Sequence, residues 1–192
     1  MKKLLLSVVG VLLFVGVSSA QEYKPFKLGL GLGYTMPGDG GGGILFDLEP
    51  AYRINDDIAV GLRIESAVMA KMSPDGSEAK ASGNVSYTVN GQYYLTDTKV
   101  RPYVGLGFGI FSLASVSSET AGTADIAGGS EFGFYPRLGL DIGHFNINLD
   151  YNLISATEAA SIDMTTFEPT TVDIKNSYIG IRVGAYFFGG KR

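Results

Sequence analysis

Apolar and small residues alternate along much of this chain, most clearly between Val100 and Leu113. Bulky residues and glycines take turns there: Val104, Leu106, Phe108 and Ile110 against Gly105, Gly107 and Gly109. A period of two places the two sets on opposite faces of a β-strand. A helix would scatter both sets and would contain three interior glycines, each costing about 1 kcal/mol. The stretch therefore predicts a strand with one apolar face and one face turned to a narrow space.

The same alternation recurs in eight segments joined by short and long connections. The expected strands are 26–36, 44–54, 58–71, 84–95, 100–113, 131–143, a segment that begins at Phe145, and 177–188. The long connections are 37–43, 72–83, 115–129 and 155–175. Alternating segments of about ten residues with such links are typical of membrane barrels. We therefore predict an all-β fold, an eight-stranded antiparallel up-and-down transmembrane β-barrel.

An even strand number returns both chain ends to one side of the membrane, the side of the short turns. We expect that side to be periplasmic and the four long connections to face outward. The last connection keeps some alternation, which predicts a protruding hairpin: Ile162 and Met164, then Val172 and Ile174.

A soluble ligand-carrying barrel of the lipocalin kind shows the same period with its faces exchanged. Two features favour the membrane alternative. The apolar rows carry roughly five large residues per strand, more than the interior of an eight-stranded barrel holds. The glycines gather on one face of the strands. In a soluble barrel this face would meet water, where glycines weaken a strand without benefit, whereas in a membrane barrel it would face a crowded interior that glycines suit.

The face opposite the apolar rows carries six basic and five acidic residues. They are Lys27, Asp47, Glu49, Arg53, Arg63, Glu65, Arg101, Arg137, Asp141, Asp150 and Arg182. Buried charges persist when they are paired and hydrogen-bonded, because each costs several kcal/mol to dehydrate. A channel that selects one ion favours a ring of a single sign. The balanced set therefore predicts a lumen closed by a structural network of ion pairs.

The N-terminus has the order of a secretory signal peptide. Lys2 and Lys3 precede an apolar run that ends at Ser18-Ser19-Ala20. The run is shorter than the roughly 20 residues that a spanning helix needs. We expect residues 1–20 to be removed and residues 21–192 to form one barrel domain. Without the two lysines the formal charge of −4 becomes −6, which argues against nucleic acid as a partner.

Two stretches resemble the small eight-stranded outer-membrane barrels of the OmpA transmembrane domain and OmpX type, with OmpW as a cousin. One is Arg101-Pro102-Tyr103-Val104-Gly105-Leu106-Gly107, and the other is Tyr178-Ile179-Gly180-Ile181-Arg182-Val183-Gly184. The resemblance covers essentially all of residues 21–192. It implies a protein of the Gram-negative outer membrane, surrounded by its lipid and lipopolysaccharide and inserted by the barrel assembly machinery.

The expected function is a non-enzymatic structural role in envelope integrity or in surface contact through the outer loops. The alternatives are a narrow channel for small solutes or hydrophobic compounds, and the soluble carrier. His144, the single histidine, falls in a short turn without a nearby serine, so catalysis is not expected. With no cysteine and no cluster of ligands in the sequence, neither a cofactor nor a metal is expected.

Overall fold

The computed structural model describes residues 22–38, 40–72, 79–118, 124–162 and 169–190. The expected signal peptide, residues 1–20, lies outside this part of the chain. Within the described residues, no helix is long and apolar enough to cross a membrane.

The described residues form ten β-strands, and their alternating sequences explain why they are extended. The strands are β1 (Phe26–Pro37), β2 (Gly42–Arg53), β3 (Ile58–Met72), β4 (Ala79–Tyr94), β5 (Val100–Ser118), β6 (Ala124–Ile142), β7 (Phe145–Ile154), β8 (Thr157–Ile162), β9 (Pro169–Ile174) and β10 (Tyr178–Phe188).

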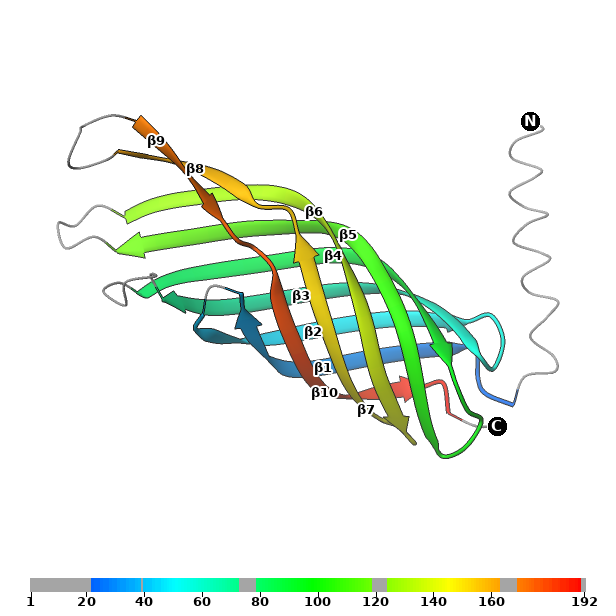
Figure 1. The fold of residues 1–192 in the computed structure, drawn as a ribbon. Helices are drawn as coiled ribbons and strands as arrows, with labels where there is room; N and C mark the ends of the chain where they lie inside the picture. Colours follow the sequence, from blue (N-terminus) through cyan, green and yellow to red (C-terminus); the bar gives the residue numbers. More distant parts are fainter. Residues whose placement is uncertain (1–21, 39, 73–78, 119–123, 163–168, 191–192) are drawn as a thin grey trace, which may run out of the picture.

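Eight of these strands close a barrel in the order β1-β10-β7-β6-β5-β4-β3-β2, every neighbouring pair being antiparallel. β8 and β9 pair with each other in a separate hairpin between β7 and β10. Figure 1 shows this hairpin projecting from the barrel beside the ends of β5 and β6. The eight-stranded up-and-down barrel is confirmed, and so is the protruding hairpin, whose predicted position Met164 lies outside the described residues.

The two ends of the barrel differ (Figure 1). One end, which we call the short-turn end, holds the β2–β3, β4–β5 and β6–β7 turns and both ends of the described chain. The opposite end, the hairpin end, holds the last residues of β3 and β5, the first residues of β4 and β6, and the β8–β9 hairpin. At the β2–β3 turn the Asn55 side chain accepts hydrogen bonds from the backbone N–H groups of Asp57 and Ile58. Such an Asx turn fixes a tight reversal.

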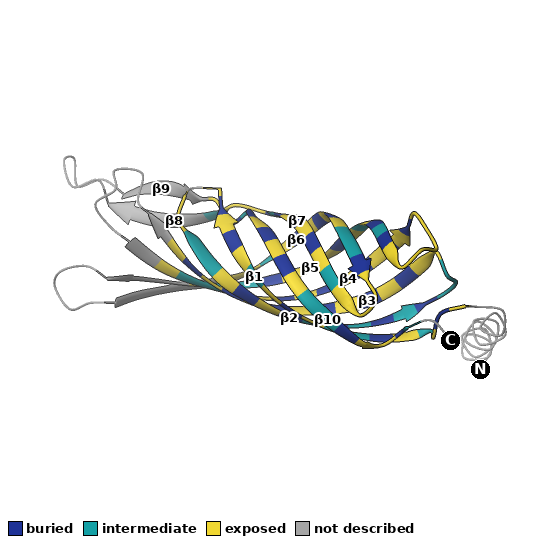
Figure 2. Cartoon of the chain, turned by 90° about the horizontal axis from the view of Figure 1, so that it is seen from below, coloured by how far each residue is buried: buried dark blue, intermediate teal, exposed yellow. Residues whose placement is uncertain are grey.

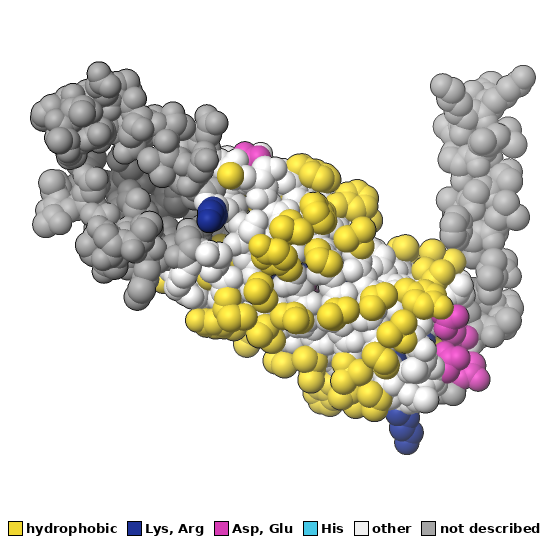
Figure 3. All heavy atoms as spheres, in the orientation of Figure 1, with side chains coloured by type: hydrophobic (Ala, Val, Ile, Leu, Met, Phe, Trp, Pro, Cys, Tyr) yellow, Lys and Arg dark blue, Asp and Glu magenta, His cyan; other side chains and the backbone are white. Residues whose placement is uncertain are grey.

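Burial alternates along the barrel strands (Figure 2). The outward rows are apolar, whereas the inward rows carry polar and charged side chains that give way to apolar ones near the hairpin end. Leu32, Leu106 and Val183 are each more than half exposed, whereas Arg63 and Arg182 are almost completely buried. Figure 3 shows apolar side chains spread over the visible outer wall of the barrel. The soluble carrier is therefore excluded, because its apolar rows would fill the interior.

Two predicted loops are wrong in their extent. The described residues of 72–83 and 115–129 are strand, since β3 continues to Met72, β4 begins at Ala79, β5 continues to Ser118 and β6 begins at Ala124. These residues are paired with the neighbouring strand. Beyond the part of the wall that carries apolar side chains, a strand needs no row of bulky outward residues, so the alternation disappears from its sequence. The backbone hydrogen bonds to the neighbouring strand continue there.

Two inward glycines leave room for tyrosine rings on a neighbouring strand. Gly107 pairs with Tyr135 and Gly139 pairs with Tyr103 across the β5–β6 ladder. A Cβ at either glycine would lie 2.1 Å from a ring carbon of the paired tyrosine. The glycine row of β5 thus serves the packing of the interior.

Candidate functional site

The barrel interior contains all eleven charged residues that the alternation assigned to it. Each is at most 5% exposed: Lys27, Asp47, Glu49, Arg53, Arg63, Glu65, Arg101, Arg137, Asp141, Asp150 and Arg182. The strand period accounts for this, because each residue occupies an inward position of its strand. The contacts divide the residues into layers along the barrel axis.

The central layer joins two arginines to three carboxylates from four strands. Arg182 contacts Glu65 and Asp150, and its Nε lies 3.3 Å from Asp47 Oδ1. Arg63 contacts Asp150, and its Nε lies 3.6 Å from Glu65 Oε2. Each of Glu65 and Asp150 is therefore shared by both arginines. This shared pairing ties β2, β3, β7 and β10 together across the lumen.

Neutral polar groups complete this layer. Arg63 donates to Asn152 Oδ1 at 3.0 Å, and its guanidinium lies 3.7 Å from the centre of the Tyr135 ring. The Tyr178 hydroxyl donates to Glu65. Hydrogen bonds of this kind make buried charges tolerable, since they satisfy lone pairs and N–H groups that ion pairing leaves over.

A second layer lies closer to the short-turn end. Arg137 Nη1 donates to Glu49 Oε2 at 2.6 Å, and Lys27 Nζ donates to Asp141 Oδ2 at 2.8 Å. The Tyr94 hydroxyl accepts from Lys27 and donates to Asp141, both at 2.9 Å. The lysine, the acid and the tyrosine thus form a closed triangle.

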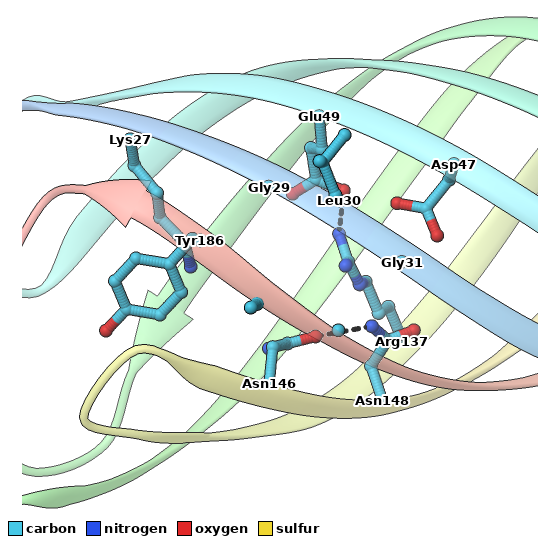
Figure 4. A pocket seen from close by; sticks show the side chains of 12 residues that line it. Lys27, Gly29, Leu30, Gly31, Asp47, Glu49, Arg137, Asn146, Asn148 and Tyr186 are labelled. Atoms are coloured by element: carbon cyan, nitrogen blue, oxygen red, sulfur yellow. Dashed lines mark hydrogen bonds and ion pairs between the residues drawn. The ribbon is translucent and has the colours of Figure 1, made fainter.

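A small cavity lies within this second layer (Figure 4). Its lining includes Lys27, Asp47, Glu49, Arg137 and Tyr186, and its volume is about 20 Å³. That volume accommodates about one water molecule. The space is too small to form a path for a hydrated solute along the lumen.

Arg53 and Arg101 are not part of the central layer; they lie at the mouth of the short-turn end. Arg53 donates to the Gly189 carbonyl, and Arg101 donates to the carbonyls of Asp56 and Thr96. Arg101 Nη2 also lies 3.7 Å from Asp97 Oδ1. Carbonyl oxygens and the rings of Tyr23 and Tyr94 hold both guanidinium groups in place, and the Asp97 carboxylate adds to this for Arg101.

An apolar layer at the hairpin end was not anticipated from the sequence. The buried residues there are Leu45, Ala67, Met69, Phe111, Tyr135, Ile154 and Tyr178. Leu45 shares the inward parity of Asp47, and Met69 shares that of Glu65. The layer could have been predicted from the sequence by following the inward-facing alternate positions of each strand past the last charged residue toward the hairpin end.

The described residues include no group of three or more histidines, aspartates or glutamates arranged to hold a metal ion. His144 lies in the β6–β7 turn, where its ring is 5.4 Å from the ring of Tyr186. What the interior offers chemically is a densely paired and nearly filled core.

The model of the family described as outer membrane protein beta-barrel domain matches residues 7–187 of this chain. Among solved structures, OprG from Pseudomonas aeruginosa has a similar fold, with a TM-score of 0.60 and 16% sequence identity over 88% of this chain and 99% of that chain. Neisserial surface protein A gives a TM-score of 0.47 and 14% identity over 85% and 96% of the two chains. Ail of Yersinia pestis gives 0.47 and 14% over 85% and 100%. The comparison with curated proteins gives no match.

Proposed function

Because this chain belongs to the outer membrane protein beta-barrel domain family and lies in the outer membrane, we propose that it is a sealed, non-enzymatic structural protein of that membrane. Its barrel resists deformation through the paired interior, and its lipid-facing wall anchors it in the bilayer. The role is the maintenance of envelope integrity, with surface contact through the segments at the hairpin end.

The observation that carries the proposal is the shared pairing of Arg63 and Arg182 with Glu65 and Asp150 across the lumen. Opening a path for solutes would separate these charges in a medium of low polarity. Removing one partner of a buried pair costs about 3–5 kcal/mol, and moving the partners apart leaves both charges uncompensated in the same way. Because the acids are shared, one pair cannot open without disturbing the other, so the closed lumen is strongly favoured.

The proposal includes an orientation and a set of partners. Short turns of such barrels lie on the periplasmic side, so the short-turn end faces the periplasm and the hairpin end faces outward. The exposed apolar wall contacts membrane lipid, and the outer rim contacts lipopolysaccharide. The barrel assembly machinery inserts the chain, since the strands reach a closed form without free edges only in the completed barrel.

Solute flux into lipid vesicles tests the function. Vesicles that contain the folded barrel are placed in an osmotic gradient of small sugars, and their swelling is followed by light scattering. We expect the rate to equal that of protein-free vesicles, because ion pairs close the middle of the lumen and the cavity in the second layer has room for about one water molecule.

The matched control is Arg182→Ala, which removes the cation that three carboxylates contact. Swelling of vesicles with the unmodified barrel, at a rate proportional to the amount of barrel, would instead support the narrow channel.

A further inference from the structure

Residues Glu22–Pro25 cross the mouth of the short-turn end before β1 begins. Four backbone contacts hold this segment. The N–H groups of Glu22 and Tyr23 each donate to one oxygen of the Asp56 carboxylate at 3.1 Å. The N–H of Lys24 donates to the Gly190 carbonyl at 3.0 Å, and the Pro25 carbonyl accepts from the N–H of Arg53 at 2.7 Å. The segment is thereby attached to both the β2–β3 turn and the C-terminal end of β10.

Tyr23 points from this segment into the mouth and is 7% exposed. Its ring lies 4.0 Å from the guanidinium carbon of Arg101 and 4.8 Å from that of Arg53. Its hydroxyl donates to the carbonyl of Asp97 in the β4–β5 turn at 3.4 Å. One side chain thus bridges the N-terminal segment and a turn on the far side of the mouth.

The same two arginines lie against a second tyrosine deeper in the lumen. The ring of Tyr94 is 4.2 Å from the guanidinium carbon of Arg101 and 5.4 Å from that of Arg53. Tyr94 then contacts Lys27 and Asp141 of the second layer. Cation–π contacts strengthen when both groups are shielded from water, so each ring favours the burial of the two guanidinium groups.

We propose that residues Glu22–Pro25 form a strap, with Tyr23 as its plug, that closes the short-turn mouth of the barrel. Release of the strap opens a vestibule that reaches Arg53, Arg101 and Tyr94 and ends at the paired charges further in. The strap is held by hydrogen bonds and ring contacts at the mouth of the barrel, whereas the central layer is held by ion pairs deep in the lumen. The mouth therefore opens locally while the barrel stays folded.

The absence of cysteine from the sequence makes a single introduced thiol a clean reporter. Ala59 is fully buried, packs with Tyr94 and Tyr103, and pairs with Arg53 across the β2–β3 ladder. Ala59→Cys therefore reports on the vestibule. Ala67→Cys is the matched control, because Ala67 is equally small, lies on the same strand and is buried in the apolar layer at the hairpin end.

The experiment follows labelling of each thiol by a small neutral methanethiosulfonate, using the full-length barrel folded in lipid vesicles. With Tyr23 present, we expect both thiols to be protected. With Tyr23→Ala, we expect labelling at position 59 to become at least about tenfold faster, because two cation–π contacts of the closed strap are lost. Labelling at position 67 is expected to stay unchanged. Tyr23→Phe retains the ring and should retain the protection.

Asp56→Ala provides a second route to the open strap, since it removes the carboxylate that accepts from Glu22 and Tyr23. It should expose position 59 as Tyr23→Ala does. Unchanged protection of position 59 in both variants would overturn the proposal. Faster labelling of positions 59 and 67 together would overturn it as well, because the whole barrel would then have opened. A conducting interior would contradict the proposed function without affecting this result.

Discussion

The middle of the lumen is closed by charge, whereas its hairpin end is closed by apolar side chains. In the middle, Arg63 and Arg182 share two carboxylates. At the hairpin end, Leu45, Met69 and Phe111 pack together with almost no exposure. Both regions use inward positions of β2, β3, β7 and β10, and the apolar layer adds inward residues of β5 and β6. The difference between the regions therefore comes mainly from side-chain chemistry.

The two regions should therefore fail in different ways. A buried charge depends on its partner, and losing one partner costs more than losing both. An apolar layer depends on volume, and its loss scales with the cavity that a smaller side chain leaves. The closed lumen thus depends on two kinds of contact. Ion pairs in the middle fix the strands relative to one another, and apolar packing at the hairpin end excludes water.

The largest effect is expected from Arg182→Ala. The substitution leaves Asp47, Glu65 and Asp150 with one fewer cation between them, and the expected loss is about 3–5 kcal/mol of unfolding free energy. The measurement is the urea midpoint of the barrel in detergent, together with the temperature at which the folded band shifts on a gel. Arg63→Ala should lower the shift temperature in the same direction.

Lys99→Ala is the control for this substitution, because Lys99 is exposed in the β4–β5 turn. Its effect should remain within about 0.5 kcal/mol. An Arg182→Ala barrel as stable as this control would show that the ionic layer does not hold the strands together.

Phe111→Ala should cost about 3 kcal/mol, because it removes a completely buried ring from the apolar layer. Phe108→Ala is matched to it on the same strand, but its ring faces outward and is 52% exposed. The same urea titration should show a smaller loss of unfolding free energy for Phe108→Ala, because its ring lies on the outer wall and its removal leaves no cavity in the packed interior. Equal losses would mean that the hairpin end is loosely packed.

A double-mutant cycle on Glu49 and Arg137 measures how strongly one ion pair of the lumen is coupled. Arg137→Ala leaves Glu49 without the arginine that donates to it, whereas Arg137→Ala combined with Glu49→Ala removes both charges. We expect a coupling energy of about 1–3 kcal/mol from the four urea titrations. Strictly additive losses would show that the two side chains act independently.

The smallest effect is expected from Gly107→Ala, at about 1–2 kcal/mol. The new methyl group would lie 2.1 Å from the Tyr135 ring, and relieving such overpacking typically has a cost of this order. Gly91→Ala is the control, because a Cβ at Gly91 meets no heavy atom within 4 Å. If both variants unfold at the same urea concentration, the tyrosine has room to move aside.

Strand number, pairing direction and the inward or outward side of each residue could be predicted, because all three follow from the period of two. Which charges meet could not: Arg63 and Asp150 are 87 positions apart, and their contact depends on how the strands are staggered around the barrel. The apolar layer could have been found from the parity of Leu45 and Met69. The role of Tyr23 could not, since it precedes β1 and follows no strand pattern.

The most direct test of a sealed interior is the current through the refolded barrel in a planar lipid bilayer at moderate voltage. We expect no reproducible unitary steps from the unmodified protein, because paired charges and the apolar layer both block the lumen. Discrete steps of constant size that scale with salt concentration would contradict it.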